Sequence, residues 1–354
     1  MNVDPLALAR PEILALKPYE HAAWDPRLER LHANESPWRV PNDESGAGLN
    51  RYPEPQPKEL VEALAALYGV SPQQLLVGRG SDEGIDLLTR AFCAAGRDAV
   101  LVCPPTFGMY AVAARIQGAD VIPIPLLAEA GFALDAVAIG ARCATGDVKL
   151  VFLCSPNNPT GNLLGEGDIQ SVVEAAAGRA LVVIDEAYLE FADAASQSRS
   201  IARQPHVVVL RTLSKAYGLA GARIGTLVAD PRIVDLLRKV LPPYAIAQPC
   251  IEGALRALAA PQRRVARERI AALKRERERL AAALAALPCV SRVWPSTTNF
   301  LLTAFTDPAE ALERLRRNRL LVRDFSGRPG LERALRITVG SPPQNDRLIR
   351  SLAC

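Results

Sequence analysis

Patterns for metal binding and for disulfide bonding are both missing from this sequence of 354 residues. Its seven cysteines include no CxxC pair, and several lie in apolar runs such as AVLVCPP and LVFLCSP. We interpret most of them as core thiols of a protein in a reducing compartment. The three histidines lack the spacing of metal ligands, so the sequence offers no zinc site.

A strong charge bias and a long apolar run are also absent. The net charge is +4, which over this length is too small to argue for nucleic-acid binding. The first twenty residues lack a cleavable signal pattern, and no apolar run reaches the length of a membrane span. We therefore expect a cytoplasmic protein that acts on small molecules and binds neither nucleic acid nor membrane.

What the sequence does have is an alternation of apolar runs with helical patterns from about residue 45 to 245. Hydrophobic residues make up 49% of the chain, enough for a large core, and its length predicts two unequal domains. The alternation is typical of an α/β fold with a mostly parallel sheet covered by helices on both faces, a three-layer αβα domain. The strand-like runs are QLLVG, AVLVCPP, DVIPIPL, VKLVFLCSP, ALVVIDEAY and HVVVLRTLS.

The remainder of the chain predicts a smaller α+β domain, formed by residues 246–354 and completed by residues 1–44. A charged helical pattern at 262–288 is followed by the strand-like runs SRVWPSTTNFLLTAF and LRITVG. A nucleic-acid arm would also be basic. Here, however, Arg and Lys alternate with Glu and with an Ala/Leu stripe, which favours a solvated amphipathic helix.

Polar residues follow the predicted strands at their carboxyl ends, where open parallel sheets bind ligands. Lys215 follows HVVVLRTLS, and by itself it would most simply be a surface lysine. Asp185 ends ALVVID thirty residues earlier. A desolvated amine attacks an aldehyde, and pyridoxal phosphate needs a carboxylate beside its pyridine nitrogen. Together the two residues favour a pyridoxal phosphate enzyme in which Lys215 forms the Schiff base.

The glycine-rich turn at 78–84 offers a site for the cofactor phosphate at the start of a helix. Ser81 could be both the N-cap and a phosphate donor, although a plainly capped helix would explain the turn equally well. Arg223, in GLAGARIG, would add a charge-assisted contact.

Three rival motifs are incomplete. GRGSDEG has GxGxxxG spacing, and AVLVCPP ends without the acid that would bind a ribose, which argues against NAD. No GxxxxGK[ST] motif occurs, so a P-loop is not indicated. The stretch from Thr212 to Lys215 lacks the serine of SxxK acyl enzymes.

The motifs GRGSDE, SPNNPTG, IDEAY and RTLSKAYGLAGARIG together resemble those of the fold-type I aminotransferases of class I/II. The blocks LHANESPW, RYPEP and LRITVG…QNDRL narrow the resemblance to the histidinol-phosphate aminotransferase subfamily. The resemblance covers nearly the whole chain and implies a fold-type I transferase domain with pyridoxal 5′-phosphate (PLP).

The resemblance implies a role for each matching residue. Lys215 would bind PLP and move the proton between the substrate Cα and the cofactor, while Asp185 would pair with the pyridine nitrogen. Asn157 and Tyr188 would hydrogen-bond the phenolic oxygen of the ring, and Phe107 would stack on its face. The phosphate would be surrounded by Ser81, Asp82, Thr212, Ser214 and Arg223.

Other implied roles concern the substrate and a second subunit. Arg336, in LRITVG, would hold the anionic end of the substrate, because arginine binds carboxylate and phosphate through two parallel hydrogen bonds. Arg323 would be a second phosphate clamp, and Tyr19 and Asn34 would line the substrate side. Tyr52, in RYPEP, would reach the cofactor phosphate of the neighbouring subunit, which implies a homodimer.

The implied reaction is transamination between L-glutamate and imidazole-acetol phosphate, giving 2-oxoglutarate and L-histidinol phosphate in histidine biosynthesis. An aromatic amino-acid aminotransferase and a threonine-phosphate decarboxylase of the same fold remain open, because all three bind anionic groups and two arginines do not decide among them. A transcription regulator with an aminotransferase-like domain would need a helix-turn-helix module, and the first forty residues are too short and proline-rich for one.

Overall fold

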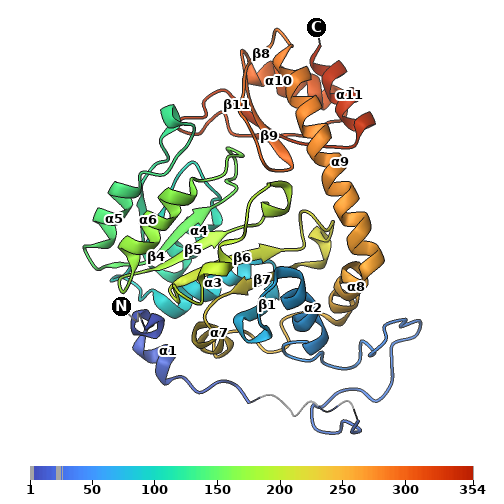
Figure 1. The fold of residues 1–354 in the computed structure, drawn as a ribbon. Coiled ribbons are helices and arrows are strands. Elements are labelled where there is room, and N and C mark those ends of the chain that lie inside the picture. The colour runs from blue at the N-terminus through green and yellow to red at the C-terminus, as the bar shows by residue number, and fades with distance from the viewer. Residues whose placement is uncertain (1–3, 21–24, 26, 354) are drawn as a thin grey trace.

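The computed structural model describes residues 4–20, 25 and 27–353 and contains two sheets (Figure 1). The larger sheet has seven strands in the order β1-β7-β6-β5-β4-β2-β3. Strand β7 runs antiparallel to both of its neighbours, whereas β2 to β6 pair in parallel. The strands are β1 (Leu75–Arg79), β2 (Ala99–Val102), β3 (Asp120–Pro123), β4 (Val148–Cys154), β5 (Leu181–Asp185), β6 (Val207–Thr212) and β7 (Ile224–Val228).

Helices cover both faces of this sheet, which confirms the predicted three-layer α/β domain. In β4, Leu150 and Phe152 join one core cluster, while Val151 and Leu153 join the cluster on the opposite face. This alternation follows from the two-residue period of a strand. The covering helices are α2 (Lys58–Tyr68), α3 (Ser81–Phe92), α4 (Met109–Gln117), α5 (Ala136–Cys143), α6 (Glu166–Ala176), α7 (Pro231–Arg238) and α8 (Gln248–Leu258).

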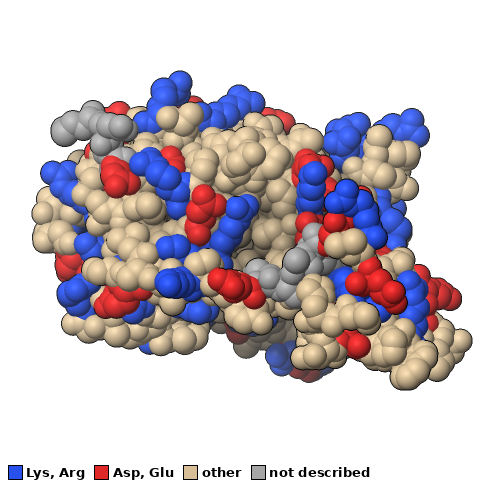
Figure 2. Space-filling model, turned by 90° about the horizontal axis from the view of Figure 1, so that it is seen from below, with Lys and Arg blue, Asp and Glu red and all other residues tan. Residues whose placement is uncertain are grey.

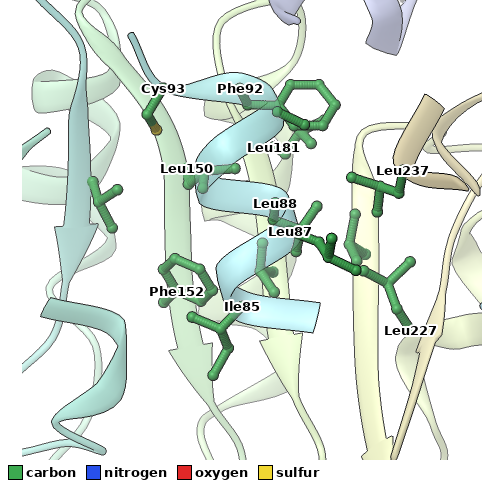
Figure 3. Close-up of a cluster of buried hydrophobic side chains, with 14 of the residues drawn as sticks. Ile85, Leu87, Leu88, Phe92, Cys93, Leu150, Phe152, Leu181, Leu227 and Leu237 are labelled. Carbon is green, nitrogen blue, oxygen red and sulfur yellow. The ribbon is translucent and has the colours of Figure 1, made fainter. Parts of the chain in front are cut away.

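The central helix of one face is α3, whose apolar side packs on the strands. Leu88 and Phe92 of this helix belong to one buried cluster with Leu150 of β4 and Leu181 of β5 (Figure 3). Burying a side chain of this size contributes about 1.5–3 kcal/mol. The amino end of α3 is thereby fixed at the edge of the sheet where β5 and β6 end.

The second sheet is smaller and fully antiparallel, with the order β10-β11-β9-β8, as expected for an α+β part. Leu301 and Phe305 of β9 and Leu335 and Ile337 of β11 pack against helices in one apolar cluster. The elements are β8 (Val290–Val293), β9 (Phe300–Phe305), β10 (Arg323–Asp324) and β11 (Ala334–Thr338), with α9 (Ala260–Ala285), α10 (Pro308–Arg317) and α11 (Pro342–Leu352).

Helix α9 is the 26-residue charged helix that the sequence predicts, and it extends from α8 to the smaller sheet (Figure 1). Leu280 and Leu284 are buried, and Arg279 pairs with Glu276 and Asp346. Positive and negative side chains are likewise mixed on the face shown in Figure 2. Among the described residues, no helix is both long and apolar enough to cross a membrane.

The packing places the N-terminal residues differently from our expectation that 1–44 complete the smaller domain. The short helices η1 (Pro5–Leu8) and α1 (Pro11–Ala15) lie beside the larger sheet (Figure 1). Leu8 and Ala9 belong to the core cluster of α3, and the Arg10 amide donates to the Ala91 carbonyl at 3.0 Å. Apolar burial near α3 therefore ties this segment to the larger domain.

The predicted boundary near residue 245 also differs from the packing. Helix α8 follows this position, yet Ile251, Ala254 and Leu258 pack with Leu60 and Leu64 of α2. The apolar face of α8 is therefore part of the larger domain, and the chain passes to the smaller one along α9. The other short 3-10 helices are η2 (Pro72–Gln74), η3 (Ala128–Ala130), η4 (Leu189–Phe191), η5 (Gln197–Ser200) and η6 (Ala220–Ala222).

Candidate active site

The carboxyl ends of β4, β5 and β6 and the amino end of α3 meet at one pocket of about 480 Å³. Because parallel strands end at the same edge of a sheet, residues far apart in sequence are adjacent here. Nine of the predicted site residues line this pocket. They are Ser81, Asp82, Phe107, Asp185, Tyr188, Thr212, Ser214, Lys215 and Arg223.

Lys215 follows β6, and its ammonium group lies 5.8 Å from the centre of the Tyr188 ring. Desolvation lowers the pKa of Lys215, and the positive charge of Arg336 lowers it further. Both effects favour the neutral amine, which is the form that attacks a carbonyl carbon. The environment of Lys215 therefore suits the predicted Schiff-base role.

Asp185 ends β5 and is only 2% exposed. Burial raises its pKa to about 6, although hydrogen bonds from Tyr110 and from the Ala187 amide act in the opposite direction. Tyr110 Oη donates to Oδ2 at 2.7 Å, and the Ala187 amide donates to Oδ1 at 3.1 Å. Because this pKa lies below neutral pH, the carboxylate form prevails there. A carboxylate can accept a hydrogen bond from a protonated ring nitrogen.

The start of α3 is built for an anion. Gly80 is the N-cap with φ of 82°, and the helix lacks a side-chain cap, so its first amides point toward the pocket without such a partner. Arg223 lies beside them and donates to the Asp82 carboxylate at 2.9 Å. Ser81, which we predicted as the N-cap, is instead the first helical residue. These groups fit a phosphate.

Space for that anion depends on Gly225 of β7. A Cβ atom at this position would collide with the carbonyl carbon of Gly80 and the amide nitrogen of Ser81. On the other side, the Thr212 and Ser214 hydroxyls lie 3.0 Å apart, and the Ser214 amide donates to Thr212 Oγ1 at 3.1 Å. The glycine allows the backbone of α3 to approach β7 closely.

The structure corrects the prediction that Asn157 is the asparagine at the cofactor pocket. Asn157 points away from the pocket, because its side-chain amide donates to the Pro105 carbonyl at 2.8 Å and to Thr160 Oγ1 at 2.6 Å. Its Oδ1 accepts from Thr106 at 2.9 Å. Asn158 lines the pocket instead. Two adjacent asparagines look alike in sequence, and only the turn after β4 decides which one faces the ligand.

Arg336 reaches the Asn158 side of the pocket from β11 of the smaller sheet. Its Nη1 donates to Asn158 Oδ1, and its guanidinium group lies 5.1 Å from the Phe300 ring and 5.6 Å from the Phe325 ring. Burial lowers the pKa of Arg336, and its buried Nε has no hydrogen-bond partner among the described residues. A half-buried cation with an unused donor is suited to an anionic ligand.

Besides Asn157 and Arg336, four further predicted residues are absent from the pocket lining. Arg323 is exposed on β10 and is paired in register with Arg336. Tyr19 is 67% exposed, and Tyr52 is 49% exposed with its ring stacked on Tyr244 at 4.6 Å. Asn34 and Tyr52 line a separate hollow near the start of α8. Within a single chain, these residues do not complete the site.

Sequence reasoning missed three residues at the site: Tyr110, Cys154 and Asn158. Tyr110 is three residues after Phe107 in PPTFGMY. In the sequence it is indistinguishable from the other apolar residues of the helical pattern that follows. Cys154 resembles a core thiol, because the apolar run of β4 continues up to the pocket.

Comparison with known proteins now identifies the family. The family described as aminotransferase class I and II matches residues 30–352. This chain belongs to the class I and II aminotransferases. The chain is 52% identical to the histidinol-phosphate aminotransferase of Xylella fastidiosa (strain 9a5c) over 323 residues, 91% of this chain and 88% of that protein.

Two further relatives extend the comparison. The histidinol-phosphate aminotransferase of Stenotrophomonas maltophilia is 48% identical and aligns over 99% of this chain and 97% of that protein. The crystal structure of histidinol-phosphate aminotransferase from Sinorhizobium meliloti in complex with pyridoxal-5′-phosphate matches with a TM-score of 0.77. It is 26% identical and covers 85% of this chain and 82% of that one. PLP is the cofactor of this aminotransferase family, as predicted.

We predict that Gly225→Ala weakens PLP binding by more than tenfold, because the added methyl group displaces the first turn of α3. Overpacking of this kind also costs about 1–3 kcal/mol of stability. Titration of the apoprotein with PLP and thermal denaturation measure the two effects. Gly221→Ala is the matched control, since a Cβ at Gly221 meets no atom within 4 Å. Equal PLP affinity in both variants would contradict the assignment of this cradle.

Proposed function

We propose that this aminotransferase moves an amino group between L-glutamate and imidazole-acetol phosphate, producing 2-oxoglutarate and L-histidinol phosphate in histidine biosynthesis. The observation that carries the proposal is Arg336, a half-buried cation with an unused donor whose charge acts on Lys215. It is supported by the similarity of the chain to proteins named histidinol-phosphate aminotransferase. Both substrates have an anionic end that such a group can bind.

The residues of the pocket divide the work. Bound PLP supplies an aldehyde that takes up the amino group and a ring that accepts negative charge. Lys215 would hold that aldehyde between turnovers and would move a proton from the substrate Cα. The Asp185 carboxylate would accept a hydrogen bond from the protonated pyridine nitrogen, and Tyr188 and Asn158 would hydrogen-bond the phenolic oxygen. Phe107 would pack on the ring face.

The start of α3 would hold the phosphate of PLP. The amides of the first helical turn and Arg223 would balance its negative charge. The Asp82 carboxylate accepts from Arg223 at 2.9 Å and so orients the guanidinium group. The hydroxyls of Ser81, Thr212 and Ser214 would supply further contacts to the phosphate.

We assign the substrate side to Arg336 and, on the open side of the pocket, to Arg323. Arg323 pairs with Arg336 in the β10–β11 register, so both cations belong to the same antiparallel pair. The phosphate of histidinol phosphate carries more negative charge than the carboxylate of glutamate. A second arginine, Arg323, would help to balance this additional charge. Tyr19 and Asn34 stay proposals for lining the substrate.

We also propose a homodimer in which Tyr52 reaches the cofactor phosphate of the partner subunit. Tyr52 lies outside the pocket of its own chain and exposes half of its surface. Large apolar side chains are exposed along the same segment, including Leu28, Leu31 and Trp38. Apolar surface of this extent in a globular protein is typically covered by a partner.

A cytoplasmic location completes the proposal. It is supported by the cysteines that the structure describes, which are free, and by the burial of four of them. Free thiols of this kind persist in a reducing compartment.

A panel of half-reactions tests the substrate. Histidinol phosphate, phenylalanine, aspartate and threonine phosphate would each be mixed with the PLP-loaded enzyme, and absorbance would report its conversion to the pyridoxamine form. We expect histidinol phosphate to react with the highest kcat/KM. A higher value for phenylalanine would favour an aromatic aminotransferase, and release of carbon dioxide from threonine phosphate would favour the decarboxylase. The control is Lys215→Ala, which should bind PLP without turnover and without borohydride-fixed label.

Arg336→Ala is expected to lower kcat/KM for both glutamate and histidinol phosphate by roughly 10- to 100-fold, the loss of a charge-assisted hydrogen-bonded pair. Arg336→Lys keeps the positive charge but loses the planar guanidinium group that makes two parallel hydrogen bonds. Its kcat/KM should lie between the values of the wild type and of Arg336→Ala. Arg333→Ala removes an exposed arginine nearby and serves as the control. A loss confined to one half-reaction would show that the two substrates use different arginines.

Mixed dimers test the role of Tyr52. Tyr52→Ala and Lys215→Ala chains would be denatured together, refolded and assayed at limiting PLP. If Tyr52 acts in the partner site, each mixed dimer contains one site with both residues, and activity rises above the mean of the two parents. If Tyr52 acts in its own chain, mixing restores nothing. Sedimentation of the wild type at assay concentration checks that the dimer is present.

A further inference from the structure

Tyr110 of α4 lies next to the pocket and has no role in the assignments above. Its side chain is fully buried, and its hydroxyl donates to Asp185 Oδ2 at 2.7 Å. Asp185 lines the pocket, whereas Tyr110 lies behind it. The hydrogen bond therefore approaches the carboxylate from the protein interior and leaves its pocket side open to a ligand.

Two aromatic rings fix the position of this hydroxyl. The Tyr110 ring stacks on Phe152 of β4 with centroids 4.7 Å apart and planes at 5°. Phe107 meets it edge-on at 5.6 Å and 82°. Because the Tyr110 ring is fully buried and packs against both of these rings, its hydroxyl keeps its direction. Phe107 also lines the pocket, so the same aromatic group borders the cofactor site.

The environment of Asp185 explains why a donor is needed there. Burial favours the neutral carboxylic acid, and the Asp82 carboxylate acts in the same direction, while the Lys215 ammonium opposes it. Tyr110 and the Ala187 amide are the two hydrogen-bond donors to the carboxylate. Burial also raises the pKa of Tyr110 well above its usual value, so the phenol keeps its proton and stays a donor.

We propose that Tyr110 is a positioning residue that holds the Asp185 carboxylate charged and directed at the pyridine nitrogen of bound PLP. It acts through Asp185 and does not touch the cofactor. The hydroxyl compensates the buried charge from one side, and the protonated ring nitrogen compensates it from the other. This inference rests on the cofactor assignment of the proposed function and adds a residue outside the pocket lining.

The test uses Tyr110→Phe, which keeps the ring stack with Phe152 and removes only the hydroxyl. Apoprotein would be titrated with PLP and with 1-deazapyridoxal 5′-phosphate, an analogue in which a C–H group replaces the ring nitrogen. We expect the variant to bind PLP about tenfold more weakly than wild type, the size of one hydrogen bond to a charged group. Binding of the deaza analogue should be unchanged, because it has no ring proton for Asp185 to hold.

Tyr68→Phe is the matched control, since it removes another buried tyrosine hydroxyl that is not bonded to Asp185. Thermal denaturation of both variants reports any general loss of packing. The ¹⁵N shift of labelled PLP supplies a second readout, which should move toward the unprotonated ring only in Tyr110→Phe.

An equal loss of affinity for PLP and for the deaza analogue would overturn the proposal, because Tyr110 would then act on the site only through packing. Unchanged PLP affinity with an unchanged ¹⁵N shift would overturn it as well. Neither result touches the proposed function, which would fail if the wild-type chain bound no PLP. The two failures are therefore distinguishable.

Discussion

Burial of the larger sheet on both faces is the constraint on which the rest of this structure depends. Strands covered on two sides favour apolar residues, and Val, Leu and Ile supply 12 of the 18 residues of β4, β5 and β6. Polar groups gather near the strand ends, and the buried Arg211 of β6 is paired with Glu186 and Glu190. Parallel pairing then brings Asp185 and Lys215 to the same edge, where a cofactor can be held by groups that the apolar core keeps rigid.

The same burial sets the chemistry of the pocket. It raises the pKa of Asp185 to about 6 and lowers the pKa of Lys215 from its usual value. The charged form of Asp185 needs donors, and it has them in Tyr110 and the Ala187 amide. The site is therefore a small electrostatic network anchored in the core rather than a set of independent side chains.

The smaller sheet brings Arg336 to Asn158 of the pocket, and further contacts join it to the larger part of the chain. Phe300 of β9 meets Tyr188 edge-on at 5.1 Å and also lies under the Arg336 guanidinium group. Arg277 of α9 donates to the Phe191 carbonyl at 3.3 Å and to the Thr298 carbonyl at 3.0 Å. These contacts bring Arg336 of the smaller sheet close enough for its charge to lower the pKa of Lys215.

By itself the sequence determined the strand alternation, the lysine and aspartate at two strand ends and the glycine-rich helix start, because each is a local pattern with a local physical cause. Tertiary structure decided what depends on direction and on distant neighbours. The turn after β4 places Asn158, and not Asn157, in the pocket lining. The N-cap of α3 is Gly80. Tertiary structure also placed Tyr110 behind Asp185, since no spacing in the sequence tells which buried hydroxyl will meet a carboxylate from another element.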